Sequence, residues 1–321
     1  MRPDAPEDGW RRMLQLILHH YDFSNYSEKV RIAMGYKSLD WDSVTIPAVL
    51  PKPELVALTG GYRRAPVLQI GADIYCDTRL ILREIDRGKP DPTLYPEGHA
   101  GLANAMAAWA EGQLFRSVML YAWGTNHDLM PPELFADRAR MRELPKPSIA
   151  AVERAAARNA PLVRLQLSLI EEMLADGRRW LGGDAFTTAD LAVYHAMWFM
   201  TDRSQRLAHE FAAFQALATW MKRVGDLGHG RPRPMSAEDA LDVARACEPA
   251  APRPSRPQPE DPGLGSLVEI RAADYAQDRI VGSLDFLDDD EVSIRISNHR
   301  VGRVAVHFPR MGFEMRPARH G

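Results

Sequence analysis

The sequence predicts an α+β protein made of three consecutive segments that differ in periodicity. The first segment mixes short apolar strands with short helices, the second is helical throughout, and the last fifty residues alternate apolar and polar positions as antiparallel strands do. Two proline-rich stretches separate them, with three prolines in residues 88–97 and six in residues 249–262. The 321 residues therefore divide into a mixed unit, a helical unit and a smaller β unit.

The mixed segment, residues 13–88, has the element order β-α-β-α-β-β-α. Its short apolar runs predict strands, and apolar residues three or four positions apart predict the helices between them. Gly71, Ala72 and Asp73 form a turn signal between the last two strands. We expect strands at 13–21, 41–46, 67–70 and 74–76, and helices at 27–34, 51–58 and 77–86.

The next segment, residues 98–228, has helical periodicity only. Its first long helix is expected between Leu102 and Ala122, and a proline-rich break follows at 131–147. Further helices are expected over 149–173, 187–201 and 211–221.

The remaining chain consists of a proline-rich linker, residues 229–264, and a small antiparallel β domain, residues 265–317. A short helix at 237–246 is expected to interrupt the linker, and about five strands are expected after it. Residues 266–316 carry nine acids and seven Lys or Arg, which argues against a nucleic-acid module. We expect this sheet to pack on the helical domain or on a dimer partner; a substrate- or partner-binding role is the alternative.

Composition excludes several classes of protein. A formal charge of −3 gives no attraction to nucleic acid or anionic lipid, and no apolar run approaches the ~20 residues needed to cross a bilayer. Two cysteines exclude a disulfide scaffold and suit a reducing compartment, so a cytoplasmic location is expected. His19 and His20 are adjacent in a predicted strand and point to opposite faces, so we expect no metal site there.

Three short motifs carry the chemistry. The first is Ser24 to Arg31, SNYSEKVR, directly after the first strand. A hydroxyl at this point lies beside a helix N-terminus, where free N–H groups stabilise an anion or a thiolate. The alternative is that Ser24 or Ser27 serves only as an N-cap.

The second motif is Arg64-Ala65-Pro66-Val67 at the start of the third strand. With a cis proline the backbone of Val67 is free to pair with an extended peptide ligand, whereas a trans proline would mark an ordinary turn. The third motif is Asp77-Thr78 at a helix start. These two side chains either cap the helix or hold a ligand's ammonium and carboxylate groups.

Together the motifs resemble the N-terminal domain of the glutathione transferase superfamily. The matching stretches are SNYSEKVR at 24–31, RAPVL at 64–68 and DTRLI at 77–81, and FTTADL at 186–191 resembles the family's buried helix-capping motif. The resemblance covers residues 13–225. It implies a thioredoxin-like domain followed by an all-helical domain, a homodimer, and a role in detoxification.

The resemblance also implies roles for single residues. Ser24 would be the catalytic hydroxyl that hydrogen-bonds the thiolate of glutathione, the co-substrate. Val67, after a cis Pro66, would pair with the cysteinyl backbone; Asp77 and Thr78 would hold the γ-glutamyl end, and Arg64 would lie near the glycyl carboxylate. Tyr21 and Ser27 are alternative hydroxyls. Asn25 departs from the proline that is common after the serine, and Asp77 and Thr78 stand where glutamate and serine are commoner.

The expected reaction is attack of the thiolate on a small hydrophobic electrophile. Its pocket is expected between residues 22–26 and the first long helix, with candidates Trp109, Phe115, Met119, Tyr121, Trp123 and His127. A glutathione-dependent etherase, dehalogenase or peroxidase shares the same motifs. A non-catalytic binding or scaffold protein on this fold is the rival hypothesis.

Overall fold

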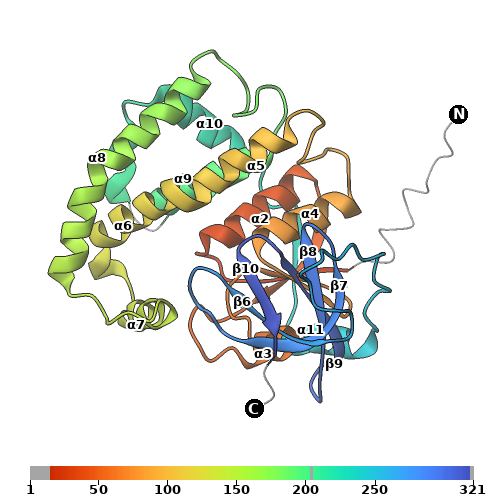
Figure 1. Ribbon diagram of the computed structural model, residues 1–321. Helices are drawn as coiled ribbons and strands as arrows, with labels where there is room; N and C mark the ends of the chain where they lie inside the picture. Colours follow the sequence, from red (N-terminus) through yellow and green to blue (C-terminus); the bar gives the residue numbers. More distant parts are fainter. Residues whose placement is uncertain (1–14, 203–204, 319–321) are drawn as a thin grey trace, which may run out of the picture.

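The computed structural model describes residues 15–202 and 205–318. The chain forms a helical part and a sheet-bearing part that lie side by side, with helices α2 and α4 between them (Figure 1). In the described ranges, no helix combines the length and the apolar character that crossing a membrane requires.

The N-terminal segment has the expected order of strands and helices. Parallel pairing joins β1 to β2, and antiparallel pairing joins β1 to β3 and β3 to β4. This is the thioredoxin-like arrangement that the resemblance implies, and it is confirmed. The elements are β1 (Leu16–His20), α2 (Asn25–Tyr36), β2 (Asp40–Thr45), α3 (Pro53–Thr59), β3 (Val67–Ile70), β4 (Asp73–Cys76) and α4 (Thr78–Gly88).

Each strand of this sheet is buried on both faces. Alternate residues point to opposite sides, so Leu16 and Leu18 pack with the core under α2 and α4 while Ile17 packs with the core under α3. This explains why β1 is a continuous apolar run and not an alternating one.

The C-terminal strands extend the same sheet. Neighbours from β6 to β9 pair antiparallel, as expected, and β10 pairs with β6. Strand β9 then pairs in parallel with β4, so the ten described strands form one sheet in the order β10-β6-β7-β8-β9-β4-β3-β1-β2-β5. The added strands are β6 (Leu267–Ala272), β7 (Ile280–Leu287), β8 (Glu291–Asn298), β9 (Gly302–Pro309) and β10 (Phe313–Pro317).

The expected position of this β unit on the helical domain is therefore wrong. Its buried side chains share one core with the thioredoxin-like segment: Val268, Ile280 and Leu284 belong to the same cluster as Leu55 and Leu58 of α3. The alternation of apolar residues was read correctly, but it does not specify which strand edge the new strands join.

The linker also contributes to the sheet-bearing part. The predicted helix is present as α11 (Ala237–Ala246), which packs against α3 and β9 (Figure 1). A short strand that the sequence did not indicate, β5 (Arg231–Pro234), pairs in parallel with β2. Prolines occupy alternate positions of β5, which is tolerated because it is an edge strand.

A buried ionic group joins β9 to β4. His307 of β9 lies between two carboxylates, with Nε2 3.1 Å from Asp73 and Nδ1 2.8 Å from Glu291, and its ring stacks on Tyr75 at 4.5 Å. Burial lowers the pKa of His307, but the two carboxylates outweigh it and raise the pKa above its ordinary value. The contacts of His307 with Asp73 of β4 and Glu291 of β8 therefore join the two strand systems.

The helical part contains the predicted long helices and one that was missed. The first long helix is α5 (Ala100–Trp109), a π-helical turn (Ala110–Leu114) and α6 (Phe115–Thr125) in direct succession. The expected break at 131–147 contains α7 (Pro132–Met141), because proline at a helix start costs no hydrogen bond. The others are α8 (Ile149–Leu174), α9 (Thr188–Thr201) and α10 (Gln215–Gly225), with 3₁₀ turns at His127–Leu129 and Gln205–Phe211.

The FTTADL motif caps α9 as expected. Thr187 and Asp190 form a reciprocal capping box, and the Asp190 carboxylate also accepts hydrogen bonds from Leu181 N at 2.8 Å and Trp220 Nε1 at 3.0 Å. Asp190 is fully buried, so this carboxylate fixes α9 against α10 within the core.

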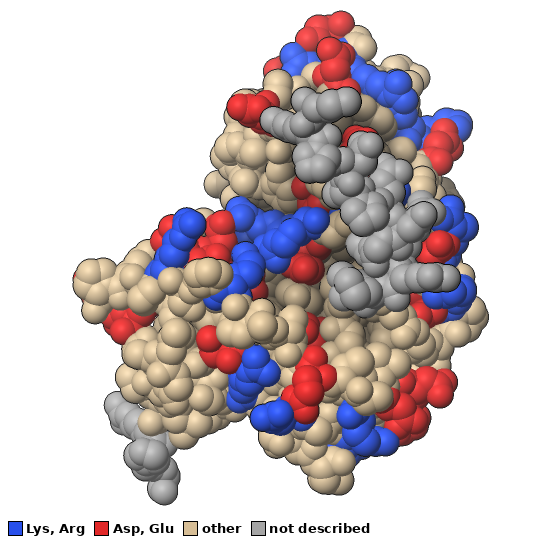
Figure 2. Space-filling model, turned by 90° about the vertical axis from the view of Figure 1, so that its right-hand side faces the viewer, with Lys and Arg blue, Asp and Glu red and all other residues tan. Residues whose placement is uncertain are grey.

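Charges on the molecular surface are mixed. On the face in Figure 2 acidic and basic side chains are interspersed, with one larger basic group near the middle of the face.

We predict that His307 titrates above the ordinary histidine value of about 6.5. Because the pKa of His307 is raised in the folded state, protonation of His307 stabilises the fold at pH values below the ordinary histidine pKa. This stabilisation is lost as the pH rises through the folded-state pKa. NMR titration of the imidazole signals, with His307→Gln to assign the resonance, measures this. A midpoint at or below the ordinary value would contradict the ionic joint between β4 and β9.

Candidate functional site

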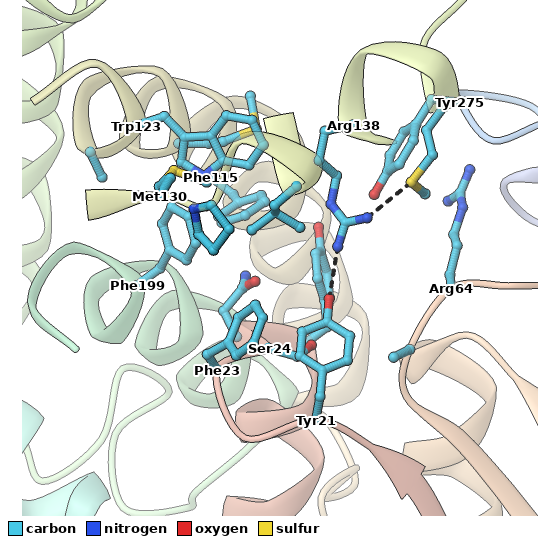
Figure 3. A pocket seen from close by; sticks show the side chains of 18 of the residues that line it. Tyr21, Phe23, Ser24, Arg64, Phe115, Trp123, Met130, Arg138, Phe199 and Tyr275 are labelled. Carbon is cyan, nitrogen blue, oxygen red and sulfur yellow. Dashed lines mark hydrogen bonds between the residues drawn. The ribbon is translucent and has the colours of Figure 1, made fainter. Parts of the chain in front are cut away.

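An open cleft lies between the two parts of the molecule. Its walls come from the loop after β1, the segment before β3, helices α6 and α7, and a loop between β6 and β7 (Figure 3). Ser24, Tyr21, Arg64 and Ala65 all line it. The first two motifs predicted from the sequence therefore meet in one cavity.

Ser24 stands at the position the sequence predicts, between β1 and α2. It is the N-cap of α2: its hydroxyl oxygen accepts a hydrogen bond from Ser27 N at 3.2 Å. The capping reading is therefore correct, but it uses only the acceptor side of the hydroxyl, and the O–H proton remains available to a ligand in the cleft. The capping and ligand-binding roles are compatible.

Tyr21 is a second hydroxyl in the same wall. Its oxygen accepts a hydrogen bond from Arg138 Nη2 at 3.1 Å, and the side chain of Lys52 lies 5.6 Å from its ring centre (Figure 3). The phenol proton is then directed away from Arg138 and is available as a donor. The third hydroxyl, Ser27, is fully buried and does not line the cleft.

The loop that carries Tyr21 and Ser24 is held by hydrogen bonds from α2 and α9. Arg31 of α2 donates to the Asp22 carbonyl in the turn at 2.8 Å and to the Glu28 carboxylate of the same helix at 2.7 Å. Asn25 lies 2.7 Å from His195 Nδ1 of α9, which ties the loop to the helical part. Burial lowers the pKa of His195 well below its usual value, so this contact involves a neutral imidazole.

The segment before β3 differs from the prediction at Val67, whose backbone was expected to be free to pair with a ligand. The Ala65–Pro66 bond is cis, as the resemblance implies. Val67, however, is fully buried and is paired with His19 of β1 on one side and Cys76 of β4 on the other. No open strand edge remains at Val67, whereas Ala65, which precedes the cis proline, lines the cleft.

Asp77 and Thr78 lie behind the cleft wall, at the start of α4. Asp77 caps the helix through Arg79 N at 2.9 Å with a φ of 73°, and Thr78 accepts a hydrogen bond from Lys29 Nζ at 3.1 Å. Lys29 is also paired with Glu111 of the π-helical turn. Burial and then the nearby Glu111 raise the pKa of Asp77. This cluster thus combines two carboxylates with one ammonium group.

The apolar wall is formed in part by the predicted aromatic residues. Phe115, Met119 and Trp123 line the cleft, and Phe199 of α9 packs edge-on against Phe115 at 5.4 Å (Figure 3). The other three candidates face elsewhere: Trp109 packs against the helical core, Tyr121 hydrogen-bonds Glu210, and His127 lies 3.2 Å from Glu153.

Sequence reasoning missed six polar residues of the cleft: Lys52, Arg63, Asn126, Arg138, Arg142 and Tyr275. Arg138 and Arg142 are one helical turn apart, and this i,i+4 spacing is a signal that was available within the stretch read as a proline-rich break. Nothing local marks Tyr275, because only the pairing of β9 with β4 brings its loop to the cleft.

The loop of Tyr275 is held by both parts of the molecule. Asp274 pairs with Arg64 and Asp278 lies 3.1 Å from Arg63, both on the segment before β3. From the helical side, Met141 O accepts a hydrogen bond from Ala276 N at 2.6 Å. The C-terminal strands therefore supply a third wall of the cleft.

Comparison with known proteins agrees with this architecture. Residues 18–93 match the N-terminal domain family of glutathione S-transferases, and residues 130–226 match the C-terminal domain family. A glutathione S-transferase from Rhodospirillum rubrum shares the fold, with 21% identity, coverage of 66% of this chain and 88% of that one, and a TM-score of 0.51. FtsZ-localized protein A of Caulobacter vibrioides is 26% identical over 184 residues, which are 56% of this chain and 74% of that protein.

One solved structure is similar over nearly the whole length. A GST-like protein from Pseudomonas syringae is 34% identical, covers 95% of this chain and 99% of its own, and has a TM-score of 0.77. Coverage of that extent takes in most of the C-terminal strands as well as the two matched domains. The chain belongs to the glutathione S-transferase superfamily.

Proposed function

We propose that this protein is a glutathione-dependent transferase that activates the thiol of glutathione for attack on a small hydrophobic electrophile. One observation carries the proposal: Tyr21 and Ser24 face the same cleft, and the oxygen of each already accepts a protein hydrogen bond. Each hydroxyl is thereby oriented to donate its proton to an anion between them, which is what a thiolate needs.

The rest of glutathione has complementary groups in the cleft and next to it. The backbone at Ala65, before the cis proline, is exposed to the cleft for the cysteinyl unit. The γ-glutamyl ammonium and carboxylate suit the cluster of Asp77, Thr78, Lys29 and Glu111 at the start of α4. Arg64 is already paired with Asp274, whereas Lys52 is bonded to the Arg63 carbonyl at 3.0 Å. We therefore assign the glycyl carboxylate to Lys52, with Arg64 beside it.

In the reaction, the thiol proton leaves to solvent and the sulfur remains as a thiolate between the two hydroxyls. Arg138 polarises the phenol of Tyr21 through the 3.1 Å hydrogen bond, which strengthens Tyr21 as a donor. The thiolate then attacks an electrophile held against Phe115 and Trp123. The same half-site would supply the thiolate for ether cleavage, dehalogenation or peroxide reduction, because each of these begins with attack of the glutathione sulfur on the second substrate; in peroxide reduction a second glutathione then completes the disulfide. A homodimer, a cytoplasmic location and a detoxifying role belong to this proposal.

A non-catalytic binding role is the second candidate, because one relative is named for localization with FtsZ. The two candidates differ in one property. A protein that only binds other proteins does not need hydroxyls that lower the pKa of a bound thiol, whereas the transferase does.

Ser24→Ala and Tyr21→Phe each remove one donor to the thiolate. We expect each to raise the pKa of bound glutathione by about one unit, because one unit corresponds to ~1.4 kcal/mol, the scale of one charged hydrogen bond. Ultraviolet absorbance of the thiolate, followed against pH in the complex, measures this. Ser27→Ala is the matched control: it removes a buried hydroxyl off the cleft and is expected to change nothing. An unperturbed thiol pKa in the parent complex would refute the transferase.

Lys52 predicts a pH dependence of binding. Burial, and then the nearby Arg138, lower the pKa of Lys52 to about 8. The cation that attracts the glycyl carboxylate is therefore present at neutral pH and lost above that value. Titration calorimetry with S-methylglutathione, which has no thiol, is expected to show affinity falling between about pH 7 and about pH 9. In Lys52→Arg this fall should disappear; an equal fall in both proteins would contradict the assignment.

A further inference from the structure

The cationic side chains that line the cleft differ in whether a carboxylate lies within ion-pair distance. Of the five that line it, Arg63 lies 3.1 Å from Asp278, Arg64 is paired with Asp274, and Arg138 lies 2.7 Å from Asp137. Lys52 is the cation assigned above to glutathione. That leaves Arg142, for which the described residues provide no carboxylate within ion-pair distance.

Arg142 is held in place by weak partners. Its Nη1 donates to the Arg138 carbonyl at 3.0 Å, and its Nη2 lies 3.4 Å from the thioether sulfur of Met119. A thioether is a poor acceptor, so a guanidinium with this environment gains from an anionic ligand. Burial lowers the pKa of Arg142; Tyr275 and Asp274 oppose this shift, and the adjacent Arg138 and Arg64 add to it.

The loop between β6 and β7 completes this corner of the cleft. The ring of Tyr275 lies 4.0 Å from the Arg64 guanidinium and 4.9 Å from that of Arg142, and its hydroxyl points into the cavity (Figure 3). Tyr275 therefore lies between the guanidinium of Arg64, which is paired with Asp274, and the guanidinium of Arg142. It also offers a neutral hydrogen-bond donor next to Arg142.

The opposite side of the same cavity is aromatic. Phe115, Trp123, Met130 and Phe199 gather across the cleft from Arg138 and Tyr275 (Figure 3). Arg142 touches this side too, because Met119 belongs to α6, the helix that carries Phe115 and Trp123. A ligand with a flat apolar body and one anionic group matches both halves.

We propose that the second substrate is an aromatic electrophile that carries a carboxylate, and that Arg142, with Tyr275 beside it, binds the carboxylate. The reaction of this electrophile rests on the proposed function, whereas the binding of its carboxylate does not. Arg142 is a specificity-determining residue in this view, and the C-terminal strands act by bringing Tyr275 to the substrate.

A matched pair of electrophiles tests this: 4-chloro-3-nitrobenzoate and its neutral methyl ester. In both, the glutathione sulfur bonds to the ring carbon that carries chlorine, the C–Cl bond breaks, chloride leaves with the electron pair, and the thiol proton goes to solvent. The ratio of kcat/KM for the acid to that for the ester is compared between the parent protein and each variant, at saturating glutathione. Intrinsic reactivity of the two compounds cancels in this comparison.

Arg142→Gln is expected to lower kcat/KM for the acid about ten-fold or more while changing that for the ester less than about two-fold. Arg142→Lys should recover part of the loss. Arg140→Gln is the matched control, because Arg140 lies on the same helix, is exposed and does not line the cleft. Equal effects on acid and ester, or weakened glutathione binding with the ratio unchanged, would overturn the assignment.

Calorimetric binding of 4-chloro-3-nitrobenzoate separates this inference from the proposed reaction. Binding that Arg142→Gln abolishes, without any turnover, would uphold the anion site and refute the transferase. Turnover of the ester with no preference for the acid, and binding of the acid that ignores Arg142, would uphold the transferase and refute the anion site.

Discussion

The parallel pairing of β9 with β4 determines where the C-terminal strands β6 to β10 lie. It sets Asp73, Ile74 and Tyr75 opposite Ala305, Val306 and His307 and fuses two strand systems into one sheet. Because β6 to β9 are joined by antiparallel pairing, the position of β9 fixes the others, and the loop between β6 and β7 is carried to the cleft. The third wall of the site thus follows from one strand contact on the far side of β4.

Local signals in the sequence were enough for the elements and for half of the site. Ser24 and Arg64 were placed correctly because a strand end and a helix start in fixed order bring them together, and α11 begins and ends at the predicted residues. The strands after residue 265 were likewise recognisable from alternation. Local signals do not specify which strand pairs with an edge strand, because pairing at either edge of the sheet is compatible with the same alternation of apolar and polar residues.

The missed residues have different physical reasons. Arg138 and Arg142 lie on a helix that starts with proline, and prolines in the sequence were interpreted as a break. Tyr275 has no local signature because its role depends on contacts with Arg64 and Arg142, far away in the chain. Val67 was assigned a free backbone, although a strand with partners on both sides has none.

The two halves of the cleft have different origins and different chemistry. The thioredoxin-like half supplies the hydroxyls of Tyr21 and Ser24, whereas α6, α7 and the C-terminal loop supply aromatic rings and a cation. The two halves are joined by ion pairs, because Arg63 and Arg64 of the first half hold the loop of the second.

Hydrogen exchange of the full chain, with and without S-methylglutathione, tests the three-walled site most directly. The account predicts slower exchange on binding in three segments at once: residues 21–26, residues 63–68 and the loop at 273–279. Protection of the first two segments with an unchanged loop would show that the C-terminal strands lie outside the site and would contradict the account.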